Sequence, residues 1–265
     1  MRSLKMLLVM VLVLFFAAPA CAHRSGGKVD VEIVPDNGGM FSKIPFKDYF
    51  SGQTHIVKKY LEARRGENYS IVVRNTMPER IGVVIAVDGR NIISGKKSYL
   101  SNNEMMYVVG PDDSVKLEGW RTDDSAVHKF YFTDVTDSYS VRTFGDTSAM
   151  GLISVAVFRE KDRPLMFHDS PHMENAPAPS AGAPGESSSK RYKSESAGTG
   201  FGDRKYSPVV RVEFAPESIP LEKILLKYEW RDVLCKKGLL NCGQEDRNRL
   251  WNEYGYAPFP PGYRE

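Results

Sequence analysis

The 265-residue sequence lacks a concentration of charge of either sign. Its 36 Lys and Arg residues nearly balance its 33 Asp and Glu residues, and the formal net charge is only +3. A dedicated nucleic-acid-binding protein carries a basic patch or stripe. The composition therefore argues against nucleic acid as a partner, while 42% hydrophobic residues is an ordinary value for a globular protein.

Nucleotide-binding motifs are also missing. The apolar segment 81–87 ends at Asp88-Gly89 and continues as "RNIISGKK", without the glycine spacing of a G-x-G-x-x-G or G-x-x-x-x-G-K-[ST] loop. Asp-Gly is a favoured β-turn pair, so the segment is interpreted as a central strand that ends in a turn. The later "GTGFG", residues 198–202, has no predicted strand before it, so phosphate binding is not expected there either.

Cysteine is scarce, with three residues in all. Cys235 and Cys242 enclose "KKGLLN", and neither a second cysteine pair nor a nearby histidine is present to build a zinc site. In an oxidising compartment this spacing around a glycine predicts a local disulfide, which would contribute about 2–3 kcal/mol by closing a small loop. Two free, partly buried thiols are the alternative.

Long apolar runs are absent except at the N-terminus, where Met6 to Phe16 is apolar throughout. This run is too short to span a bilayer. Basic residues precede it and small residues follow it, which is typical of a secretory signal peptide, here residues 1–22. Cleavage is expected after Ala20 or Ala22.

Cys21 leaves a second outcome open. A signal that ends in small residues and a cysteine is similar to the lipobox of bacterial lipoproteins, in which that cysteine is acylated. The preceding triplet, Ala18-Pro19-Ala20, departs from the pattern because it contains a proline and no larger aliphatic residue. The expected location is the periplasm or outer membrane of a bacterium, with membrane contact only through a lipid anchor on Cys21.

Long amphipathic helices are missing, and the apolar period is 2 along most of the chain. Short strands separated by Gly, Pro, Asn and Asp clusters are typical of a sandwich or barrel. We therefore predict an all-β fold, an antiparallel β-sandwich over residues 28–168. Strands are expected at 29–33, 69–73, 81–87, 105–109, 115–120, 130–132, 152–158, 210–214 and 224–230.

Residues 169–208 differ in composition from the rest. They hold 5 Pro, 5 Gly, 8 Ser and 5 Ala, which predicts a disordered low-complexity linker or loop. Residues 209–242 contain only two expected strands, too few to bury a core alone, so they are predicted to complete the sandwich. Residues 243–265 are predicted to form a C-terminal tail, with a short helix at 244–254.

Candidate metal ligands lie mainly in the acidic loops near the predicted strand ends. No cofactor is expected from a motif, although several such carboxylates at one end of a sandwich could hold Ca²⁺. The alternative is that aspartate is common in turns because its side chain bonds to the backbone. His168 and His172, at the start of the predicted linker, are a weaker candidate for a transient metal site. The aspartates are Asp112, Asp113, Asp123, Asp124, Asp134 and Asp137.

Four residues are candidates for contact with a sugar or peptide. Trp120, Arg121, Tyr131 and Tyr139 combine aromatic rings with a guanidinium group, as binding platforms do. Aromatic residues on strands also belong to hydrophobic cores, so a structural role is the alternative.

A catalytic motif is missing as well. The stretch "GDTSAMG", residues 145–151, has some likeness to a nucleophile elbow, but its spacing does not fit G-x-S-x-G. A nucleophilic Ser148 would need His55 or His128 and an acid brought to it by the fold. The sequence therefore leaves enzymatic activity uncertain and favours its absence.

The blocks "IGVVIAVDGRNIISGKKSYL", "EGWR", "FYFTD" and "GDTSAMGLISVAV" resemble a family of uncharacterised bacterial exported proteins. "AGTGFG", "YSPVVRVEF" and "LKYEWRDVLCKKGLL" are similar to the C-terminal part of that family. The likeness covers about residues 56–160 and 197–242. It implies a protein of the bacterial envelope and carries over no activity, cofactor or site residue.

These features lead to two main hypotheses. The first is a non-catalytic binding or assembly module of the bacterial envelope, with an envelope protein or a glycan as its partner. The second is an envelope hydrolase that acts on glycan or peptide through a site assembled from distant loops. A third, structural part of a surface appendage, would be favoured by an uncovered edge strand.

Overall fold

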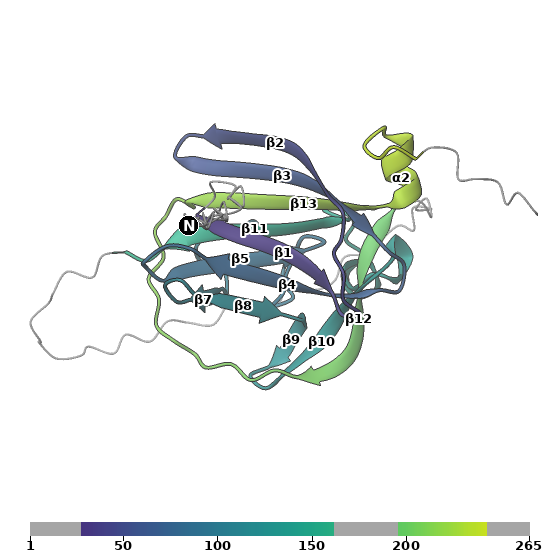
Figure 1. Cartoon of the computed structure of the whole chain (residues 1–265). Coiled ribbons are helices and arrows are strands. Elements are labelled where there is room, and N and C mark those ends of the chain that lie inside the picture. Colours follow the sequence, from purple (N-terminus) through teal and green to yellow (C-terminus); the bar gives the residue numbers. More distant parts are fainter. Residues whose placement is uncertain (1–27, 162–195, 243–265) are drawn as a thin grey trace, which may run out of the picture.

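The computed structural model describes residues 28–161 and 196–242 (Figure 1). The predicted signal peptide 1–22 with Cys21, the histidines His168 and His172, and the tail 243–265 lie outside the described residues. Among the helices that are described, none combines the length and apolar character needed to cross a membrane.

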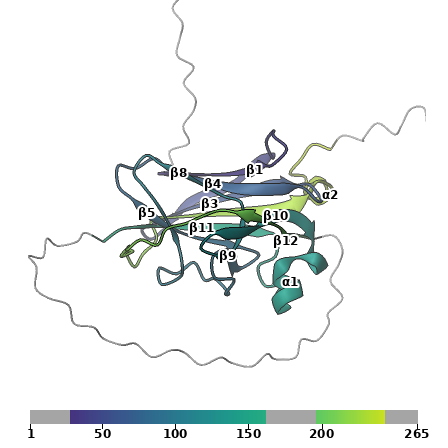
Figure 2. The ribbon, with the colours of Figure 1, turned by 90° about the horizontal axis from the view of Figure 1, so that it is seen from below.

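The described residues form two β-sheets that pack as a sandwich, which confirms the predicted fold class (Figure 1). Figure 2 shows β1 and β4 in one layer over β3 and β11 in the other. The six-stranded sheet contains β1 (Val29–Pro35), β4 (Asn68–Asn75), β10 (Ala126–Asp134) and β12 (Ala197–Tyr206) in that order, with β8 (Ser114–Leu117) on β4 and β9 (Gly119–Asp123) on β10. The seven-stranded sheet contains β2 (Lys43–Ser51), β3 (Thr54–Ala63), β13 (Glu222–Trp230), β11 (Leu152–Arg159), β5 (Ile81–Val87) and β6 (Arg90–Asn91), with β7 (Tyr107–Val109) on β5. The helices η1 (Val135–Asp137), α1 (Tyr139–Phe144) and α2 (Arg231–Lys236) are short.

One strand pair departs from the predicted antiparallel arrangement. β13 pairs with β3 in parallel, from Glu222 opposite His55 to Trp230 opposite Ala63. On its other side β13 pairs with β11 in the antiparallel sense. A hairpin forces antiparallel pairing, whereas strands joined by a long connection are free to run in parallel. β13 thus lies inside the seven-stranded sheet and shares that layer with β2 and β3.

The predicted linker 169–208 is too long at its C-terminal end. Residues 197–206 form β12, which pairs along β10, so "GTGFG" lies in a strand. The glycines there reflect packing, because a Cβ atom at Gly200 would overlap the ring of Tyr131. The predicted strand at 210–214 is also wrong. That segment has no strand partner, and Val210 and Val212 are 86% and 56% exposed.

β5 is the most deeply buried strand, as its unbroken apolar sequence predicted. Each of its residues is buried. Its inward residues, such as Val83 and Ile85, belong to the main core between the sheets. Its outward Val84 packs with Phe158 and with the partly buried Met106 of the loop before β7. Both faces of the strand are therefore covered.

A buried polar network joins the two sheets at the end of β5. Asp88 is 1% exposed, and its Oδ1 accepts hydrogen bonds from Gly151 N (2.8 Å) and the Tyr228 hydroxyl (2.5 Å). Its Oδ2 accepts from Thr199 N (2.7 Å), and the Thr199 hydroxyl bonds to Tyr228 and to Tyr69. Burial raises the pKa of Asp88 to about 6, although these hydrogen bonds lower it in part. The network links β4, β5, β12 and β13.

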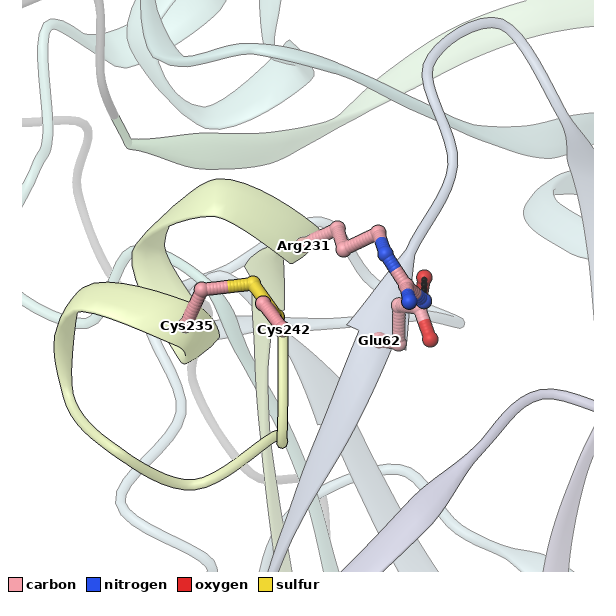
Figure 3. The surroundings of a disulfide bond; sticks show 4 residues. All are labelled: Glu62, Arg231, Cys235 and Cys242. Atoms are coloured by element: carbon pink, nitrogen blue, oxygen red, sulfur yellow. Dashed lines mark hydrogen bonds and ion pairs between the residues drawn. A yellow bond between two sulfur atoms is a disulfide. The ribbon is translucent and has the colours of Figure 1, made fainter. Parts of the chain in front are cut away.

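The predicted disulfide is confirmed. Cys235, in α2, is bonded to Cys242, with their Cα atoms 5.5 Å apart (Figure 3). In the same helix, Arg231 Nη1 lies 3.1 Å from Glu62 Oε1 of β3. The disulfide closes the loop after α2, and the ion pair holds that helix against the seven-stranded sheet.

Candidate ligand-binding groove

The predicted aromatic platform does not form, because Trp120 is a core residue. It is 2% exposed, and its indole N–H donates to the Gly200 carbonyl (2.9 Å). Tyr139 packs against Trp120 with ring centroids 4.6 Å apart. Arg121 instead donates to the Tyr107 hydroxyl and to the Ser207 carbonyl, at 2.8 and 2.9 Å. Tyr131 is half-buried and faces the glycines of β12.

The acidic loops show local partners. Asp113 and Asp123 accept hydrogen bonds from the N–H groups of Ser114 and Ser125. Within 28–161 and 196–242, no three His, Cys, Asp or Glu side chains are grouped so as to hold a metal ion. Ion pairs or exposed positions account for the others: Asp124 pairs with Arg211, Asp134 pairs with Arg65, and Asp112 and Asp137 are exposed.

Ser148 is not part of a triad. It is exposed, and its N–H donates to the Asp146 carboxylate in the turn before β11. The ring of His128 bonds to the Gly202 carbonyl, and the ring of His55 bonds to two carboxylates. Neither histidine bonds to Ser148, so the fold does not bring these groups together.

A concave site lies between β1 and the β2–β3 hairpin. β1 ends one sheet and β2 ends the other, so in the described part of the chain each has a single strand neighbour. The inner face of β3 is only half-buried there, and a groove of about 550 Å³ lies over it. Its lining includes the apolar residues Val31, Pro45, Val57, Leu221 and Ile224 and the polar residues Asp48, His55 and Glu222.

The parallel pairing of β3 and β13 puts the polar groups of the groove together. His55 and Glu222 are directly opposite in register, and both point to the inner face. Along β13 the buried residues alternate from Glu222 through Ile224 to Leu226. Glu222 thus belongs to an inward row that is otherwise apolar. Sequence reasoning missed it because the alternation was followed only from Ile224 onward.

Asp48, His55 and Glu222 form a bonded cluster in the groove. His55 Nδ1 lies 3.0 Å from Glu222 Oε1, and His55 Nε2 lies 2.5 Å from Asp48 Oδ1. The Phe50 ring stacks on the imidazole, with centroids 4.9 Å apart. Glu222 is 2% exposed, and its second oxygen, Oε2, is buried without a hydrogen bond. One carboxylate oxygen in the groove is therefore left without a donor.

The pKa values of the cluster favour a protonated imidazole. Burial lowers the pKa of His55, but the hydrogen bond to Asp48 and the negative charges of both carboxylates outweigh it, so that pKa is raised. Burial raises the pKa of Glu222, and the nearby His55 and Val29 N–H lower it in part. The cluster of one imidazolium and two carboxylates therefore carries a net charge of −1.

The groove combines groups that can contact a ligand. It offers an aliphatic wall, a buried carboxylate oxygen and two exposed sheet edges. No serine, threonine or cysteine among the described residues bonds to His55, so a protein nucleophile is not assembled there. No family model matches this chain, and no curated protein or solved structure matches it either.

Proposed function

We propose that the protein is a non-catalytic binding or assembly module of the bacterial cell envelope, with its ligand held in the groove between β1 and the β2–β3 hairpin. The supporting observation is the groove over the inner face of β3, where the half-buried His55 and Val57 lie beside the buried Glu222 and Ile224 of β13. A volume of about 550 Å³ is within the range of ligand sites, and the mixture of an apolar wall with a few polar groups is typical of them.

Two features support the envelope as the location. The disulfide between Cys235 and Cys242 is compatible with an oxidising compartment. The basic, apolar and small-residue segments of the first 22 residues have the order of a signal peptide. The likeness to exported bacterial proteins points the same way. Whether the chain is secreted freely or anchored by lipid depends on Cys21.

We expect the exported chain to begin at residue 21, 22 or 23. The intact mass of the protein from the envelope fraction measures this directly. A mass that includes acyl chains on Cys21 would establish a lipid anchor, whereas a mass that starts at His23 would establish plain secretion. Recovery of the envelope protein with Met1 retained would contradict a cleaved signal.

A groove-filling substitution tests the proposed function. Val57 lines the groove, and the adjacent Ile56 is a similar half-buried residue on the opposite face of β3. Val57→Trp should reduce at least tenfold the amount of a specific envelope component that the mature protein retains, because the ring occupies the site. Ile56→Trp should retain it as the wild type does. Quantitative mass spectrometry of the bound material gives the comparison.

Equal retention by both variants, with unchanged thermal melts, would show that the groove is not the binding site. The state of the retained component distinguishes the second candidate, a hydrolase that acts on glycan or peptide. Its one supporting observation is His55 held between two carboxylates, an arrangement suited to general acid–base chemistry. Intact ligand after long incubation fits a binding module, and cleaved fragments would favour the hydrolase.

A further inference from the structure

We infer that the groove recognises a basic side chain in an extended peptide segment, with the ammonium or guanidinium group bonded to Oε2 of Glu222. This inference rests on the proposed function, since it names the class of ligand for the same groove. It is carried by the buried oxygen, by the charge of the cluster and by the free strand edges beside it.

Oε2 of Glu222 lacks a hydrogen-bond donor. A buried carboxylate oxygen without a donor is unfavourable, and most such groups in proteins are bonded. Glu222 Oε1 is satisfied by His55, whereas Oε2 is buried in the groove wall without a hydrogen bond, although the Val29 N–H is near enough to lower the pKa of the carboxyl group. A ligand that brings an N–H donor to Oε2 would complete the bonding of this carboxylate.

The charge of the cluster decides which donor suits best. With His55 protonated, Asp48, His55 and Glu222 together keep one negative charge. Lys28, Lys59 and Asp30 also line the groove, but the ion pairs of Glu222 and Asp48 are with His55 and not with either lysine, so no lysine is bonded to the Glu222 carboxylate. A charged donor forms a stronger hydrogen bond to a carboxylate than a neutral donor does. A cationic group is therefore the complementary one.

The free strand edges favour a peptide as the molecule that carries the cationic group. β1 and β2 each leave one edge without a strand neighbour in the described part of the chain, and such edges bind extended peptides through backbone hydrogen bonds. The aliphatic wall of Val31, Val57 and Ile224 suits the alternate side chains of a strand. Phe50 is the one Phe, Tyr or Trp in the groove lining, and it is stacked on His55 while 72% exposed, so the groove offers a sugar a single aromatic ring and not a platform.

Selection from a random heptapeptide display library tests the inference, with the mature wild-type protein as bait and Val57→Trp for counter-selection. We expect the groove-dependent peptides to be enriched in one Lys or Arg flanked by apolar residues. Glu222→Gln keeps the shape and a hydrogen-bond acceptor for His55 but removes the charge. It should weaken the selected peptide at least tenfold in fluorescence anisotropy. Glu229→Gln, a buried carboxylate on the other face of β13, should leave the affinity unchanged.

A double-mutant cycle completes the design. Replacing the basic residue of the peptide by norleucine should cost at least tenfold on the wild type and little on Glu222→Gln, because the two changes remove the same interaction. Groove-dependent peptides without basic enrichment, or additive losses in the cycle, would overturn the inference and leave the proposed function standing. A library without any groove-dependent peptide would also overturn the inference, and the retention comparison of Val57→Trp with Ile56→Trp would still decide the proposed function.

Discussion

Asp88→Ala should lower the free energy of unfolding by about 3–5 kcal/mol. The substitution removes the acceptor of three hydrogen bonds in the core, from Gly151 N, Thr199 N and the Tyr228 hydroxyl. Each buried donor left without a partner costs about 1–3 kcal/mol. Because the network joins the two sheets, its loss weakens the contact between the layers as well. Urea denaturation followed by tryptophan fluorescence measures the change.

Asp112→Ala is the matched control for the backbone. Asp88 and Asp112 have nearly the same positive φ, 49° and 50°, but Asp112 is exposed. The control variant should therefore lose only the small preference of aspartate for this conformation, about 1 kcal/mol or less. Similar losses in the two variants would show that backbone strain, rather than the buried network, determines the cost.

Wild type and Asp88→Ala together also test the raised pKa of Asp88. Its pKa in the folded protein is about 6, compared with an ordinary value of 3.8, so the folded state binds the proton more tightly than the unfolded state. Stability from this group is therefore present below pH 3.8 and is lost as the pH rises to about 6. The difference in unfolding free energy between wild type and Asp88→Ala should shrink over that interval. A constant difference would contradict the raised pKa.

Deleting residues 209–265 should abolish the cooperative thermal transition and cause aggregation. The deletion removes β13, which lies between β3 and β11 in the seven-stranded sheet. The core loses the side chains of Leu226, Tyr228 and Trp230, and two strand edges become exposed at once. Differential scanning calorimetry and size-exclusion chromatography record the outcome.

Two controls separate the loss of β13 from the shortening of the chain. Deleting only residues 243–265 leaves every described strand in place and should preserve the transition. Proteolytic cutting within 175–195 should give two fragments that stay together, because β12 and β13 pair with strands from before the cut. A stable, monomeric fragment of residues 23–168 with a sharp melt would show that the C-terminal strands are dispensable.

Features set by short-range sequence signals were predictable. The unbroken apolar run of β5 indicated a strand covered on both faces, and the spacing of Cys235 and Cys242 indicated a local disulfide. Both depend on neighbouring residues, whose separation the sequence gives directly. The alternation at 210–214 was misleading for the same reason, because alternation alone does not supply a strand partner.

Features that depend on distant segments were not predictable. The glycines of β12 indicated a linker, and only the ring of Tyr131 across the strand pair explains them. His55 and Glu222 are opposite in the parallel register but far apart in the chain, so no local pattern predicts their pairing. The inward phase of Glu222 could have been found by extending the alternation of β13 back by two residues. The hydrogen bonds that join Glu222, His55 and Asp48 could not have been found in this way.

The internal position of β13 also governs the order in which the chain can fold. β13 is synthesised after both β3 and β11, and these two strands cannot form a continuous sheet until it lies between them. Pairings between segments so distant in sequence make folding slow. Until β13 has been synthesised, the seven-stranded sheet of an emerging chain therefore stays incomplete, with the edges of β3 and β11 open.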